Sequence, residues 1–89
     1  MNLDHITTVA EANKKLKNYT DGSLSLDGLT SADGLKLPET IDGSLSLEGL
    51  TSAKNLKLPE KMNGSLFLND FASIKKDKLR KKYPKISIL

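Results

Sequence analysis

The chain has 89 residues, no cysteine and a net charge of +3, and 37% of its residues are hydrophobic while only 4% are aromatic. This length holds a single domain, and the absence of cysteine argues against a small secreted domain held together by disulfides, so we expect a cytoplasmic protein. No stretch approaches the roughly 18 consecutive apolar residues of a membrane-spanning helix, which argues against a membrane protein.

Charge is distributed unevenly along the chain. Residues 1–71 carry seven lysines and ten acidic residues, whereas residues 72–89 carry six lysines, one arginine and one aspartate. The net charge is therefore −3 in the first part and +6 in the second. We expect a molecule that is strongly dipolar along its length.

Residues 1–20 are predicted to form an N-terminal helical cap. Thr8 and Glu11 have the spacing of a capping box, which marks the start of a helix. The apolar residues that follow at helical spacing are Val9, Ala12, Leu16 and Tyr19. The pattern predicts a helix over 8–18 whose apolar face covers the first repeat.

Residues 21–41 and 42–62 are two copies of one 21-residue sequence and agree at sixteen positions. They read DGSLSLDGLTSADGLKLPETI and DGSLSLEGLTSAKNLKLPEKM. A third, divergent copy over 63–83 begins as NGSLFLNDFAS. Divergence is expected in a terminal repeat, because it must cover the open end of a stack.

Within a repeat, leucines alternate with serines, as in Leu24-Ser25-Leu26, and this alternation predicts a short strand. Leu35 and Leu37, which are followed by a proline, predict a second extended segment. One repeat cannot bury its own leucines, but repeats stacked at the strand spacing of about 4.8 Å can do so in a parallel sheet. The leucines expected to form one buried row are Leu26, Leu47 and Leu68.

The C-terminal part is predicted to close the stack. Within 63–83 we expect a short helix that Asp77 caps and that continues through Lys82, because the residue before Pro84 disfavours helix. Residues 84–89 are predicted to form a closing strand. Its two isoleucines follow the leucines of the third strand by 20 residues.

The motif LxLxxLTS followed by LxLPE resembles a leucine-rich repeat, and the wording GLTSAxxLKLPE is similar to repeats in longer arrays of gut bacteria and their phages. The resemblance covers 21–71 closely and 72–89 loosely. It implies a short right-handed leucine-rich-repeat-like solenoid of stacked parallel strands, with an N-terminal capping helix and a C-terminal helix-strand cap. The asparagine that such repeats usually carry in their turn is absent here, and Gly28 and Gly49 stand near its place. The turn could therefore be tighter, so that a β-solenoid is an alternative to the leucine-rich-repeat fold.

The resemblance also implies a function, which is binding another protein through the strand face. For a chain of this size it further implies a stoichiometric inhibitor of a host or defence protein, encoded by a phage or mobile element and of the anti-CRISPR type. The residues expected on the binding face are Ser25, Asp27, Ser46, Glu48, Phe67 and Asn69. Phe67 stands out because it replaces serine at an outward position; it either anchors a partner or packs under the C-terminal segment.

Two charged groups leave their use open. Stacking places Asp27 beside Glu48, and such acids either keep an exposed sheet solvated, contact a basic partner or hold Ca²⁺. The basic group consists of Lys75, Lys76, Lys78, Arg80, Lys81, Lys82 and Lys85. It forms a solvated lid, binds nucleic acid, or meets an acidic surface, including that of a second copy in a homodimer or a self-assembling stack.

Catalytic residues are scarce. His5 is the single histidine, no base stands at a spacing that would activate a serine, and no glycine-rich phosphate loop occurs. We therefore expect a non-enzymatic protein without a cofactor or metal.

Overall fold

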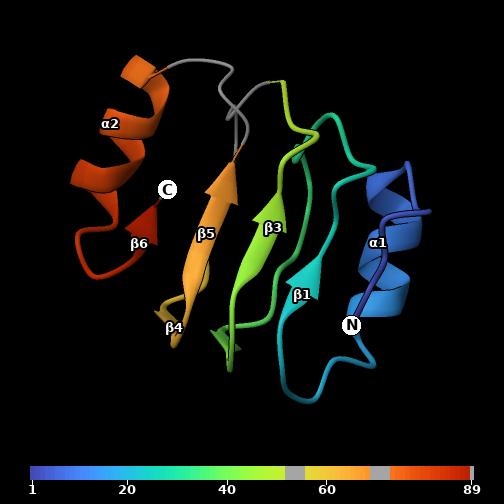
Figure 1. Ribbon diagram of the computed structural model, residues 1–89. Helices are drawn as coiled ribbons and strands as arrows, with labels where there is room; N and C mark the ends of the chain where they lie inside the picture. The colour runs from blue at the N-terminus through green and yellow to red at the C-terminus, as the bar shows by residue number, and fades with distance from the viewer. Residues whose placement is uncertain (52–55, 69–72, 89) are drawn as a thin grey trace.

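Two parallel sheets, with a helix at each end of the larger one, make up this small α/β fold (Figure 1). The computed structural model describes residues 1–51, 56–68 and 73–88. In those residues the larger sheet has the order β1 (Leu24–Ser25), β3 (Leu45–Leu47), β5 (Ser65–Leu68) and β6 (Ser87–Ile88). The smaller sheet pairs β2 (Thr40–Ile41) with β4 (Lys61–Met62).

The register of the larger sheet equals one repeat. Ser46 of β3 lies between Ser25 of β1 and Phe67 of β5, so that each residue stands beside its counterpart 21 positions away. The leucines of the predicted row are at most 5% exposed, and they are Leu26, Leu47 and Leu68. This confirms that the repeats stack in register and bury their leucines against one another.

The second predicted extended segment of each full repeat has no paired strand within the part of the chain that the structure describes. Around Leu35 and Leu37 no strand occurs in the described residues, and pairing between repeats resumes only after the proline, where the Lys61 amide donates to the Glu39 carbonyl. Proline has no N–H to donate to a ladder, and Pro38 recurs one repeat later. The two repeats therefore stay unpaired along this stretch.

Helix α1 spans Val9–Leu16, and Thr8 caps it by accepting a hydrogen bond from the Glu11 amide. It ends two residues earlier than the predicted boundary at 18, since Lys17 is its C-cap. Ala12 and Leu16 are buried, while the other two residues of the predicted apolar face pack against the core with partial exposure. The predicted N-terminal helix is therefore confirmed, whereas residues 1–7 of the predicted helical cap are not helical.

The segment before α1 is a partial repeat that the sequence analysis missed. Asn2 bridges Ser25 in the parallel sense, the Leu3 amide donates to the Ser25 carbonyl, and Leu3 and Ile6 are buried. Residues 3–7 read LDHIT and align with LDGLT in the first full repeat. The offset is 23 residues rather than 21, so a search for one fixed period does not find it.

Close stacking of neighbouring repeats explains why Gly28 and Gly49 are glycines. A Cβ at Gly28 would overlap the backbone oxygen of Asp4, and a Cβ at Gly49 would overlap that of Asp27. Adjacent repeats approach too closely there for any side chain. His5 holds the equivalent position at the outer end of the stack, where it is exposed.

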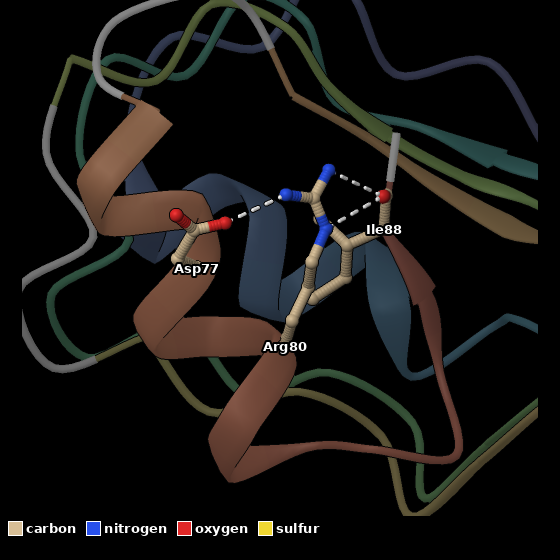
Figure 2. A network of polar contacts seen from close by, with 3 residues as sticks. All are labelled: Asp77, Arg80 and Ile88. Atoms are coloured by element: carbon tan, nitrogen blue, oxygen red, sulfur yellow. Dashed lines mark hydrogen bonds and ion pairs between the residues drawn. The ribbon is translucent and has the colours of Figure 1, made fainter.

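Helix α2 spans Ser73–Lys82 and so begins four residues before the predicted cap at Asp77. Asp77 lies inside the helix, where its carboxylate pairs with Arg80 at 3.0 Å (Figure 2). The interpretation of Asp77 as an N-cap was wrong, because an ion pair at this spacing uses the same side chain within the helix.

The closing strand is confirmed, but in another register. β6 runs parallel to β5 and places Ile88 beside Leu66, whereas the 20-residue spacing predicts Leu68. A shift of two residues keeps the same side chains on the inner face, and Ile88 remains buried. Arg80 fixes this position, since its Nε and one Nη donate to the Ile88 carbonyl at 3.3 and 3.0 Å (Figure 2).

Candidate binding surface on the strand face

The outer face of the larger sheet carries the predicted column of Ser25, Ser46 and Phe67, which lie side by side on three neighbouring strands. The two serines are half-buried, while Phe67 is 36% exposed. Phe67 is thus a large aromatic side chain that keeps about a third of its surface exposed beside two serines.

A shallow hollow of about 400 Å³ follows this column and continues to the partial repeat at the N-terminal end. Its lining consists of Met1, Asn2, Ser23, Leu24, Ser25, Ser44, Ser46 and Phe67. Among the described residues the large hydrophobic side chains exposed to solvent are Met1 and Phe67. Both therefore border one hollow, with hydroxyl groups between them.

Acidic side chains beside this hollow tie neighbouring repeats together. The Asp4 carboxylate accepts from the Ser25 hydroxyl and from the Asp27 amide at 3.0 Å. One repeat on, the Asp27 carboxylate accepts from the Ser46 hydroxyl at 2.6 Å and from the Glu48 amide at 3.0 Å. The stacked acids are thus hydrogen-bond acceptors for the next repeat, which explains why the sequence keeps them in register.

Hydrogen bonding lowers the pKa of Asp4 below its ordinary value of 3.8. The largest cause is the Ser25 hydroxyl, followed by the Asp27 amide, and both favour the charged carboxylate. Sequence reasoning did not single out Asp4. Its alignment with Asp27 in LDHIT and LDGLT was the signal that could have found it.

Serine hydroxyls give the hollow a mixed polar floor. Ser23 and Ser44 each accept a hydrogen bond of 3.2 Å from an amide of the next repeat, so their own hydrogens remain to be donated. Ser25 and Ser46 instead donate to carboxylates, so their oxygens remain to accept. These serines therefore offer a ligand both hydrogen-bond donors and acceptors.

Of the other strand-face residues expected to bind a partner, Glu48 is exposed, and Asn69 lies outside the described residues. Asp27 is half-buried and its carboxylate bonds the next repeat, so it contributes to stacking. The structure thus brings the serines and Phe67 together in one hollow with Met1, while it places Asp27 in a supporting position.

The predicted basic group divides into three parts. The side chains of Lys75 and Lys76 lie outside the described residues, and Arg80 is engaged with Ile88 and Asp77. The described lysines of this group are exposed, and they are Lys78, Lys81, Lys82 and Lys85. The first three have the spacing i, i+3 and i+4, so they share one face of α2.

The described ranges 1–51, 56–68 and 73–88 hold no cluster of three or more histidine, cysteine or acidic side chains suited to a metal ion. They also include no helix of the length and apolarity that crossing a membrane requires.

Comparison of the chain with protein-family models, with curated proteins and with solved structures found no match. The chain is thus a small α/β protein whose parallel strands pair one repeat apart and carry a hollow lined largely by serines.

Proposed function

We propose that the chain is a short leucine-rich-repeat-like solenoid that binds another protein through the outer face of β1, β3 and β5. One observation carries the proposal: the two exposed large hydrophobic side chains of the described residues, Met1 and Phe67, border the same hollow. Exposed apolar side chains gathered at one place on a small protein are typical of an interaction site.

The chemistry of the hollow favours a protein over a polyanion. Its lining contains serine, asparagine and apolar residues and no lysine or arginine. Protein interfaces have this composition at their centre, where charged residues are depleted and an aromatic anchor is common. The unused donor and acceptor capacity of the serines would bond polar groups of the partner.

A stoichiometric inhibitor would use such a surface in a one-to-one complex. This role follows from the resemblance of GLTSAxxLKLPE to repeats of gut bacteria and phages, and the defence protein of a bacterial host is the target class that it suggests.

The test compares variants of Phe67 in capture from a bacterial lysate followed by mass spectrometry. Phe67→Ser restores the residue of the two preceding repeats, so the fold is expected to persist while the apolar wall is lost. Phe67→Leu keeps an apolar wall and is the matched control. A partner that Phe67→Leu retains and Phe67→Ser loses would support the proposal, whereas equal retention by both variants would contradict it.

A nucleic-acid-binding role is the second candidate, because Lys78, Lys81 and Lys82 lie on one face of α2. Lysines aligned in this way can contact successive phosphates. Replacement of all three by glutamine is then expected to abolish a salt-dependent shift of DNA or RNA. Absence of any shift at low salt for the unaltered protein would end this candidate.

A further inference from the structure

A second surface, distinct from the strand face, runs across the repeats where their backbones are unpaired. Three shallow hollows of about 290, 450 and 270 Å³ follow one another from α1 to the residues after α2. The first and second share Lys36, Leu37 and Pro38, and the second and third share Leu58 and Glu60. The three hollows are therefore neighbours and are together named the cross-repeat groove below. They share no lining residue with the hollow on the strand face.

The cross-repeat groove exists because proline interrupts the pairing of the repeats. Side chains of the two caps, instead of neighbouring strands, satisfy amides along it: Asn13 Oδ1 accepts from Lys36 at 2.8 Å, and the Tyr83 hydroxyl accepts from Leu58 at 3.3 Å. The floor between them is apolar, with Leu58 buried and Leu37 half-buried. A ligand can therefore lie against leucine and proline without displacing a strand.

Lysines from all parts of the chain line this groove. One comes from α1 and one is its C-cap, one comes from each full repeat, and two come from the end of α2 and the turn after it. They are Lys14, Lys17, Lys36, Lys57, Lys82 and Lys85. All are exposed. The acidic lining residues are Asp33, Glu39 and Glu60. Six lysines against three acids give the groove a positive charge over an apolar floor.

We propose that the cross-repeat groove binds an extended, acidic peptide segment of a partner protein. In an extended chain, successive side chains point to opposite sides, so carboxylates on one side can meet the lysines while apolar residues on the other rest on Leu37 and Leu58. Nucleic acid fits less well, because a phosphate at every nucleotide would also meet Glu39 and Glu60. A peptide places neutral residues there.

Fluorescence anisotropy with a short labelled peptide of alternating glutamate and leucine tests this site. The double variant Lys36→Glu/Lys57→Glu is expected to weaken binding by about tenfold, or about 1.4 kcal/mol. The matched control Lys78→Glu/Lys81→Glu makes the same change in net charge outside the groove and is expected to bind as the unaltered protein does. Added salt is expected to weaken binding, because the pairs are exposed.

Several results would overturn the proposal. They are the absence of binding, equal losses in the two double variants, equal binding of a peptide that alternates lysine with leucine, and tighter binding of an oligothymidylate. Thermal unfolding followed by circular dichroism checks that the variants fold, and amide chemical shifts should move at residues 35–37 and at Lys57, Leu58 and Glu60. Phe67→Ser should leave binding of this peptide unchanged, so this experiment tests the groove independently of the proposal for the strand face.

Discussion

The inner repeats and the two capped ends of this molecule satisfy their backbones in different ways. In the inner repeats, one side chain bonds the same position of the next repeat, as when Asp27 accepts from the amide of Glu48. At the N-terminal end a single carboxamide, that of Asn13, both donates to a carbonyl and accepts from an amide of the first repeat. It takes the place of a neighbouring backbone.

Two tyrosines from the capped ends also accept hydrogen bonds from backbone amides of the repeats. The Tyr19 hydroxyl accepts from the Asp42 amide at 3.0 Å, and the Tyr83 hydroxyl accepts from the Leu58 amide at 3.3 Å. A repeat therefore stacks by being identical to its neighbour, whereas a cap must supply individual side chains that imitate a strand. Changes in the repeats should disturb the whole stack, and changes in the caps should act locally.

The largest expected effect is that of Leu47→Ala in the middle of the buried row. Leu47 is fully buried between its counterparts in two repeats, so its truncation leaves a cavity and should cost about 2–5 kcal/mol in the free energy of unfolding. The matched change in a cap is Leu79→Ala, at a residue 7% exposed, and should cost less. Urea unfolding measures both, and a larger loss for Leu79→Ala would reverse the comparison.

Gly49→Ala should come next. Its Cβ would meet the backbone oxygen of Asp27, which cannot move without separating the repeats, so we expect a loss of about 1–3 kcal/mol in the free energy of unfolding. His5→Ala at the equivalent outer position should be nearly neutral, because this side chain is exposed. Thermal unfolding of both variants checks the difference. Similar melting temperatures would mean that the repeats have room to shift.

Arg80→Ala should loosen the C-terminal cap alone. Arg80 donates two hydrogen bonds to the Ile88 carbonyl. Because the Arg80 side chain is half-exposed, these two hydrogen bonds together should contribute about 1–2 kcal/mol to the free energy of unfolding. Hydrogen exchange should quicken at β6 and remain unchanged at β3. Asp77→Ala removes only the exposed ion pair and should cost less than about 1 kcal/mol. Exchange that quickens equally in both strands would show that the cap is not a separate unit.

The smallest expected effect is the pH dependence of the N-terminal segment. Because the folded protein lowers the pKa of Asp4, the stabilisation is present above the unfolded pKa and is lost as the pH falls through the folded value. A nuclear magnetic resonance titration should find this carboxyl below 3.8, and Ser25→Ala should raise its pKa. Asp4→Asn keeps an accepting oxygen and should remove the pH dependence. An unchanged pKa in Ser25→Ala would rule out the hydroxyl as the main cause.

Much of the fold was predictable because identical repeats are expected to pair position by position. Sixteen identical positions in 21 predict that Ser25 lies beside Ser46 and that their leucines share a row, and both hold. The N-terminal helix was also predictable, since Thr8 and an apolar face are local signals. The candidate strand face followed from the register, which places Phe67 in the serine column.

The sequence by itself determined which residues stack, because identical neighbours one period apart bury the same side chains and pair the same backbone groups. Only the tertiary structure decided how the ends are sealed. The partial repeat at Leu3 stands 23 residues from its neighbour, and β6 is shifted by two residues and bonded by Arg80, since a cap is positioned by individual side-chain and backbone contacts that no period encodes. Folding likewise gathers lysines from α1, both repeats and the end of α2 along one groove, although the chain between 20 and 53 is acidic.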